Sequence, residues 1–137
     1  MKAEFSIHWK SSKQPRKQRK FLARATLKDK HKFLAAMLSK ELRKKYQRRS
    51  IPVRKDDEVM IMRGQFKKTK GKINKVFLKK SLVYVENAQV VKKDGSKTYY
   101  PIHPSNVMLL SLNLDDKKRR KILDRSKNGT LKKASGS

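Results

Sequence analysis

The chain has 137 residues, and 39 lysines and arginines against 11 acidic residues give it a formal charge of +28. This length predicts one compact domain with extensions, and the charge predicts a polyanionic partner, nucleic acid before an anionic membrane. Cysteine is absent from the sequence, which excludes disulfides and thiolate zinc sites. No apolar run approaches the ~18–20 residues of a membrane-spanning helix, and the N-terminal residues lack the apolar region of a secretory signal.

The basic residues are unevenly distributed along the chain. Residues 1–55 hold 19 lysines and arginines against three acidic residues, whereas residues 56–112 hold 11 against five and residues 113–137 hold nine against three. Only the middle part has enough apolar periodicity to form a core. We therefore predict a basic N-terminal arm with short helices at 1–52, a folded core at 53–112, and a C-terminal helix with a basic tail at 113–137.

The N-terminal residues alternate apolar and polar side chains around Trp9, which is typical of a short strand or of an extended arm that orders on a partner. Packing of Trp9 on its own domain is favoured over stacking on a base. The basic hexamer PRKQRK at 15–20 indicates phosphate contact rather than a solvated charge run, and it also fits a nuclear targeting signal. We expect residues 1–20 and 126–137 to lack a fixed fold in the free protein.

Helical periodicity follows this arm. Apolar residues between 33 and 38 recur at helical spacing, which predicts a helix over 21–38. Ser39 is the predicted N-cap of a second helix, which Ser50-Ile51-Pro52 should end because proline disfavours helix in the preceding residue. Asp115-Asp116 should begin a C-terminal helix that ends at 127–129.

Short alternating runs occupy the middle of the chain. They predict strands near 58–63, 72–79, 82–88, 97–102 and 106–110. Residues 79–81 are a predicted tight turn, Asp94-Gly95 a hairpin connection, and Pro101 with Pro104 an edge or corner. The predicted fold class is mainly β with α extensions, built on a small barrel of about five strands.

The organising segment is RKDDEVMIMRGQFKKTKGKI at 54–73, which combines a strand, a basic loop between glycines and a returning strand. Glycines permit close backbone approach to a partner, and the lysines beside them indicate a phosphate backbone. DDEVMIMRGQFKKTKGKI resembles a KOW motif, the RNA-associated loop-and-strand unit of small SH3-like barrels. Such motifs also occur in transcription elongation factors.

Three further segments, LSKELRKKY, RSIPVRKDDEV and IHPSNV, widen the resemblance. Together they resemble the archaeal and eukaryotic form of the universal large-subunit ribosomal protein family twenty-four (twenty-six in older eukaryotic naming), over most of 39–125. The resemblance implies an SH3-like barrel, contacts with large-subunit rRNA, an early role in assembly and a place near the exit of the nascent-chain tunnel. One departure is visible: the family usually has a glycine after the aromatic-lysine pair, where this chain reads Phe66-Lys67-Lys68 in a slightly shorter loop.

No pattern in the sequence indicates catalysis. His8, His31 and His103 lack a neighbouring nucleophile or acid at motif spacing, and no nucleotide-binding glycine loop is present. The acids at 56–58 should alternate faces of a strand, which favours solvation or pairing with Arg54 and Lys55 over a metal site. We therefore predict no enzyme, no cofactor, no metal and no small-molecule substrate.

Basic residues interleaved with aromatic residues indicate folded RNA as the ligand. The leading hypothesis is a structural constituent of the large ribosomal subunit with rRNA and neighbouring ribosomal proteins as partners. It would reside in the cytoplasm, with nuclear passage during assembly in a eukaryote. The alternative is a KOW-domain transcription elongation factor or another RNA-binding factor. The predicted RNA-binding residues are Arg16, Lys17, Arg19, Lys20, Arg43, Lys44, Lys45, Arg48, Arg49, Arg63, Gly64, Lys67, Lys68, Lys70, Gly71, Lys72, Lys118, Arg119 and Arg120.

Overall fold

The computed structural model describes the backbone of residues 4–134 and the side chains of residues 4–125. Its helices are η1 (Ile7–Ser11), α1 (Pro15–Arg24), α2 (Leu27–Phe33), α3 (Lys40–Tyr46), η2 (Leu78–Lys80), η3 (Pro104–Asn106) and α4 (Lys117–Ala134). Its strands are β1 (Ala35–Leu38), β2 (Ser50–Pro52), β3 (Glu58–Ile61), β4 (Lys70–Phe77), β5 (Leu82–Val91), β6 (Lys97–Ile102) and β7 (Val107–Ser111). The prediction of a mainly β fold with helical extensions is confirmed.

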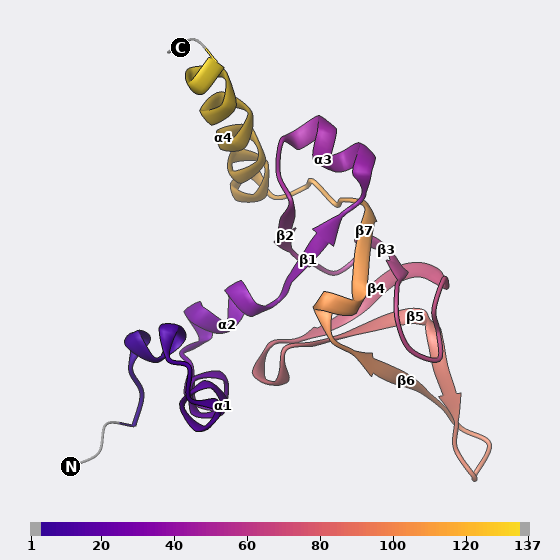
Figure 1. Cartoon of the computed structure of the whole chain (residues 1–137). Coiled ribbons are helices and arrows are strands. Elements are labelled where there is room, and N and C mark those ends of the chain that lie inside the picture. The colour runs from indigo at the N-terminus through magenta and orange to yellow at the C-terminus, as the bar shows by residue number, and fades with distance from the viewer. Residues whose placement is uncertain (1–3, 135–137) are drawn as a thin grey trace.

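The strands form one sheet in the order β2-β1-β7-β3-β4-β5-β6. The pairing of β1 with β7 is parallel, and the other neighbouring pairs are antiparallel. In the part of the chain that the structure describes, β2 and β6 do not pair with each other. These two strands are therefore the edges of an open sheet. The predicted closure into a barrel is therefore wrong, although the five predicted strands are all present. Figure 1 shows α1, α4 and the β5–β6 hairpin projecting from this sheet in three directions.

The hydrophobic core is formed mainly by buried side chains of the sheet, and it includes one residue of α3 and one of α4. Alternating residues of β3, β5 and β7 point into it, as the period-two pattern predicted. Val76 packs on the core but stays partly exposed. The buried aliphatic residues of these strands include Val59, Ile61, Val83, Val85 and Val107.

The predicted helix over 21–38 is interrupted at residues 25–26 and ends at Phe33, so the prediction is wrong for residues 34–38. The chain leaves helix after Arg24, begins α2 behind the N-cap Thr26, whose side chain accepts a hydrogen bond from the Asp29 N–H, and then enters β1. Alanine, methionine and leucine favour helix in isolation. Pairing with β2 and β7 overrides that preference, because it buries Ala36 and Leu38 and satisfies the backbone of the segment.

The ends of two other helices also differ from prediction. Ser39 caps α3 as predicted, since its Oγ accepts from the Leu42 N–H, but α3 ends at Tyr46, where Gln47 takes a left-handed φ of 49°. Residues 50–52 then form β2 instead of a helix end. Helix α4 continues through residues 127–129 to Ala134, beyond its predicted end and into the predicted unstructured tail.

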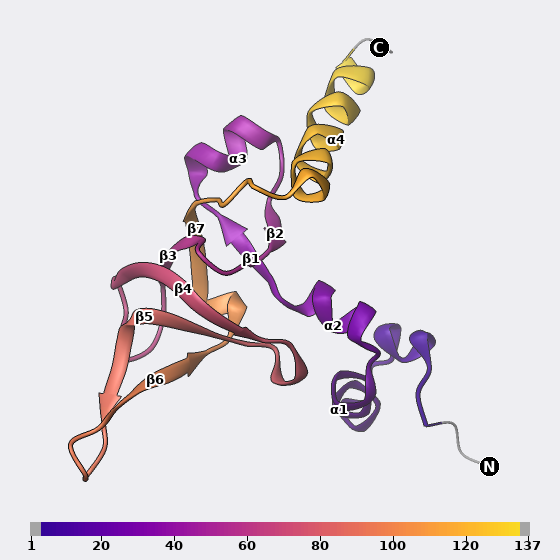
Figure 2. The ribbon, with the colours of Figure 1, turned by 180° about the vertical axis from the view of Figure 1, so that it is seen from behind.

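The N-terminal segment folds into short helices rather than a strand or an extended arm. Trp9 meets Phe5 edge to face at 6.4 Å between ring centroids, and the Lys20 Nζ lies 5.0 Å from the Trp9 centroid. Phe21 stacks on Phe5 at 5.5 Å and meets Phe33 at 5.6 Å. Trp9 therefore packs on its own chain, as predicted. Figure 2 shows these helices at the end of the molecule, joined to the sheet through α2.

Candidate nucleic-acid interface

The loop between β3 and β4 presents its basic side chains to solvent. The Lys68 N–H donates to the Ile61 carbonyl at 2.7 Å, and the Ile61 N–H donates to the Thr69 carbonyl at 2.9 Å, which closes the base of the loop. Phe66 packs on the core, with its ring 5.5 Å from that of Tyr100 on β6. The aromatic anchor points inward, so the loop exposes the basic residues Arg63, Lys67, Lys68 and Lys70.

Lys68 occupies the position where the resembled family usually has glycine. Its φ is +70°, in the left-handed region that side chains with a Cβ rarely adopt. The backbone geometry of the loop thus explains why glycine suits this position. Gly64 also has a positive φ, +91°, and no atom lies within 4 Å of where its Cβ would stand, so its backbone is open to a partner.

Gly71 has a packing role that the sequence did not predict. Its φ is not left-handed, and a Cβ there would lie 3.0 Å from the Val85 Cγ1 and 3.3 Å from the Asn87 Nδ2. Val85 is fully buried, so it has little room to move. The absence of a side chain at Gly71 serves the packing of β4 on β5, and its neighbours are strand residues of the chain itself.

Helix α1 carries a second basic surface. Arg16, Lys17 and Arg19 are exposed, whereas Lys20 is partly buried over Trp9. Pro15 stands at the first turn of the helix, where its missing N–H costs nothing, and Gln14 precedes it. The aromatic cluster beneath α1 holds the helix in place through Phe21.

A third basic surface surrounds α3. Lys44, Lys45 and Arg49 are exposed. Arg43 donates from Nε to the Leu38 carbonyl at 2.8 Å. Arg48 donates from Nε to the Ser50 carbonyl at 3.1 Å and from Nη1 to the Ile122 carbonyl of α4 at 3.2 Å. Arg43 and Arg48 therefore brace the fold, and only part of each side chain remains for a partner.

On α4, Arg119 differs from its neighbours in solvent exposure. Lys118 and Arg120 are exposed, but Arg119 is 3% exposed, and its guanidinium contacts the Asp57 carboxylate at 2.6 and 2.7 Å. An interior arginine whose charge is already matched is not free to contact phosphate. Arg119 is thus a structural residue, which corrects its predicted place in the RNA-binding set.

Asp57 likewise departs from its predicted solvation or pairing with neighbouring basic residues. It is fully buried, and besides Arg119 its carboxylate accepts from the Arg54 N–H at 2.8 Å and the Asn113 N–H at 2.9 Å. The Arg54 side chain instead pairs with Asp116 at the start of α4. No sequence signal could have identified the Asp57–Arg119 pair, because 62 positions separate the two residues.

Two further properties bear on chemistry. Among the described residues, no group of three His, Asp or Glu side chains is placed to hold a metal ion. Within the same part of the chain, no helix has both the length and the apolar character needed to cross a bilayer.

Comparison with known proteins adds an independent finding. Residues 12–126 match the model of a family described as the ribosomal proteins L26 of eukaryotes and the corresponding L24-type proteins of archaea. The chain belongs to this family. It is also 50% identical over 114 residues to the protein named large ribosomal subunit protein uL24 of Methanosphaera stadtmanae, an alignment that covers 83% of this chain and 97% of that protein. The family resemblance derived from the sequence motifs is confirmed.

The motifs that carried the resemblance lie close together in the fold. LSKELRKKY runs from the end of β1 through α3, RSIPVRKDDEV contains β2 and leads into β3, and IHPSNV contains η3 before β7. β1 pairs with both β2 and β7, so the family motifs meet at the strand that sequence periodicity missed.

Proposed function

We propose that this protein is a structural constituent of the large ribosomal subunit and that it binds rRNA. The observation that carries the proposal is the family match over residues 12–126, together with the 50% identical relative named as a large-subunit protein. Since the family consists of ribosomal proteins, a structural and non-catalytic class, the prediction that the chain is not an enzyme is confirmed.

The proposed rRNA-binding surface consists of exposed basic residues of α1, of α3 and the segment after it, of the β3–β4 loop and the start of β4, and of the first turn of α4, together with the backbone at Gly64. A charge of +28 needs a polyanion to offset its self-repulsion, and phosphate contacts from lysine and arginine release counterions. We propose that residues 63–72 act as a KOW-type RNA-binding element. The exposed members of the surface are Arg16, Lys17, Arg19, Lys44, Lys45, Arg49, Arg63, Gly64, Lys67, Lys68, Lys70, Lys72, Lys118 and Arg120.

Family membership also supports neighbouring ribosomal proteins as partners and the ribosome of the cytoplasm as the location. An early role in assembly, a position near the nascent-chain tunnel exit and nuclear passage in a eukaryotic cell stay predictions. The relative aligns over 97% of its own length, which favours the ribosomal function over that of an elongation factor built on a KOW domain.

Sedimentation tests the proposal. A tagged chain is produced in its native host, and the lysate is separated on a high-salt sucrose gradient, which removes loosely bound factors. A structural constituent should co-sediment with the large subunit at a constant ratio to a known large-subunit protein. Recovery of the chain only at the top of the gradient, or with RNA polymerase, would overturn the proposal.

A further inference from the structure

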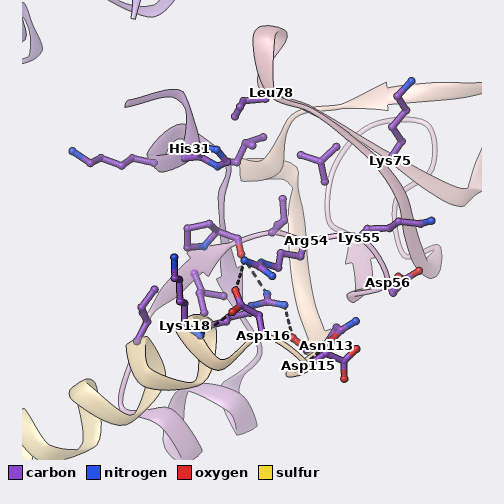
Figure 3. Close-up of a pocket in the computed structure, with 18 of the residues that line it drawn as sticks. His31, Arg54, Lys55, Asp56, Lys75, Leu78, Asn113, Asp115, Asp116 and Lys118 are labelled. Carbon is purple, nitrogen blue, oxygen red and sulfur yellow. Dashed lines mark hydrogen bonds and ion pairs between the residues drawn. The ribbon is translucent and has the colours of Figure 1, made fainter. Parts of the chain in front are cut away.

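A cavity of about 940 Å³ lies where α2, the segment before β3, the end of β4 and the start of α4 meet. Figure 3 shows His31 and Leu78 at one end and Asp115, Asp116 and Lys118 at the other. The volume falls in the range of about 300–1,000 Å³ that is typical of ligand pockets. None of the residues in the proposed rRNA-binding surface except Lys118 lines it, so it is a separate feature of the molecule.

Part of the cavity wall is aliphatic. Its aliphatic side chains come from four segments that are distant in sequence, and Leu34, Ile51 and Val53 are buried members of the core. Val76, Leu78 and Ile122 complete the wall and remain partly exposed. An aliphatic wall of this kind packs against the flat face of an aromatic ring without selecting its polar groups.

Cationic groups stand at the mouth of the cavity. Lys55, Lys75 and Lys118 are exposed and have no ion pair among the described residues, whereas Arg54 is paired with Asp116. Figure 3 shows Lys55 and Lys75 on one side of the cavity and Lys118 on the opposite side, near Asp116. Asp56 and Asp115 are the remaining carboxylates at the mouth. The unpaired lysines at the opening therefore outnumber the unpaired carboxylates by three to two.

We infer that this cavity takes the base of one unpaired nucleotide of RNA, with the flanking phosphates at Lys75 and Lys118. The inference rests on the proposed rRNA-binding function and names a site for it. An apolar wall with cations at its opening is complementary to a nucleotide, which joins a flat base to anionic phosphates. Pockets that take an unstacked base commonly hold it between aromatic or apolar side chains and hydrogen-bond its edge. His31 and Asn113 line the cavity and provide polar groups for the edge of the base.

The charge of the molecule favours RNA over a peptide as the occupant. A segment of a neighbouring protein would also bury apolar side chains against the wall, but it would have to be acidic to satisfy the lysines at the mouth. RNA supplies an anionic phosphate at each nucleotide, whatever its sequence. A protein occupant is therefore the contrary outcome in the test below.

The test compares protein variants with filled and open cavities, each bound to large-subunit rRNA of the source organism that is transcribed in vitro. Val76→Trp places an indole in the cavity, and Leu78→Trp provides a second filling variant in case the first fails to fold. Val91→Trp is the matched control, because Val91 is a strand residue 60% exposed on the β5–β6 hairpin, away from the cavity. Hydroxyl radicals report on the RNA backbone, dimethyl sulfate reports on unpaired adenines and cytosines, and a carbodiimide reports on unpaired uracils and guanines.

The wild type and Val91→Trp should protect the same bases. With a filled cavity, one base should regain the reactivity it has in free RNA, while the backbone footprint elsewhere persists. Affinity should fall about five- to hundredfold, as for the loss of one base contact. Base protection that is identical in all folded variants would overturn the inference alone. Absence of any backbone footprint with the wild type would overturn the proposed rRNA binding and the inference with it.

A crosslink distinguishes the two kinds of occupant. A photoreactive benzoylphenylalanine replaces Lys55, an exposed residue at the mouth that leaves the apolar wall open, and the protein is incorporated into large subunits and irradiated. A crosslink to a single rRNA nucleotide, the one identified by base probing, supports the inference. A crosslink to a neighbouring protein overturns it and leaves the ribosomal function intact.

Discussion

Arg119 on the first turn of α4 forms a paired contact with Asp57, which directly precedes β3. Its Nη1 and Nη2 donate to the two carboxylate oxygens at 2.6 and 2.7 Å. The same guanidinium donates to the carbonyls of Asn113 at 2.8 Å and Pro52 at 3.3 Å. The pair thus ties the start of α4 to β2, β3 and the segment after β7. It determines the direction in which the basic helix leaves the sheet.

Removing Arg119 should destabilise the protein strongly. We expect Arg119→Met to lower the free energy of unfolding by about 3–5 kcal/mol, because it leaves the buried Asp57 carboxylate without its charge partner. Urea denaturation measures the change. Arg120→Met is the matched control on the next, exposed position of α4, and it should change stability by less than about 0.5 kcal/mol. Equal effects of the two substitutions would contradict a structural role for the pair.

Asp116, which directly precedes α4, should make stability depend on pH. The backbone hydrogen bond from Lys118 lowers the pKa of Asp116 below its ordinary value of 3.8, and the charge of Arg54 lowers it further. The folded chain therefore favours the ionised carboxylate. Its contribution is complete above the unfolded pKa and is lost as pH falls through the folded pKa.

We expect the stability difference between the wild type and Asp116→Asn to be constant above about pH 5 and to shrink below the ordinary pKa of an aspartate. Urea unfolding at a series of pH values measures this difference, and carboxyl NMR of Asp116 measures its pKa directly. A carboxyl that titrates at or above 3.8 in the folded protein would rule out the mechanism.

Replacing Lys68 by glycine should stabilise the β3–β4 loop. Lys68 has a φ of +70°, which costs a residue with a Cβ about 1–2 kcal/mol. Glycine removes this cost, but the greater flexibility of glycine in the unfolded chain offsets part of the gain in stability. We expect Lys68→Gly to raise the free energy of unfolding by about 0.5–1 kcal/mol. Lys67→Gly removes the same charge at a position without a positive φ, so it should give no gain.

Adding a methyl group at Gly71 should disturb packing and leave RNA contact unaffected. The new Cβ would lie 3.0 Å from the Val85 Cγ1, and we expect Gly71→Ala to cost about 1–3 kcal/mol. Val85→Ala in the same chain removes that contact, so the double variant should lose less than the sum of the two single losses. Additive losses in thermal or urea unfolding would place the strain elsewhere.

The β3–β4 loop should contribute to RNA affinity through charge. We expect Lys67→Glu together with Lys70→Glu to weaken binding to rRNA fragments of any sequence, because phosphate contacts position the protein without specifying bases. If about 10 phosphates are contacted, a plot of the logarithm of the binding constant against the logarithm of the salt concentration should have a slope of about −7 to −9.

Charge reversal of Lys92 and Lys93 at the tip of the β5–β6 hairpin is a matched control outside the proposed surface. Filter binding or fluorescence anisotropy on folded variants measures both effects. If the loop reversal affects binding no more than the hairpin reversal does, the loop is not a binding element. Gly64→Ala adds a Cβ where no other residue is close, but its φ of +91° strains alanine. A loss of RNA affinity would therefore indicate close approach of the RNA only in a folded variant whose loop keeps its native NMR shifts.

Local patterns were sufficient for most of the elements. Alternation of apolar residues predicted β3 to β7, and Asp94-Gly95 predicted the hairpin, where Gly95 has a φ of +80° and the Lys92 N–H donates to the Ser96 carbonyl. Ser39 predicted the cap of α3. These features depend on neighbouring residues only, so they are visible in the sequence. The family motifs and the charge likewise indicated the proposed ligand class before the tertiary structure was considered.

Tertiary structure alone decided the features that join distant segments. Residues 35–38 favour helix by themselves and become β1 because β2 and β7 offer backbone partners on both sides. In the sequence, Arg119 resembles the exposed basic residues around it. In the fold it is buried because it pairs with Asp57, 62 positions away. In the sequence, Gly71 resembles a flexible loop glycine. In the fold, the Val85 side chain occupies the space that a Cβ at this position would need. In each case the contact that fixes the residue's role comes from a remote part of the chain, and no local pattern carries information about it.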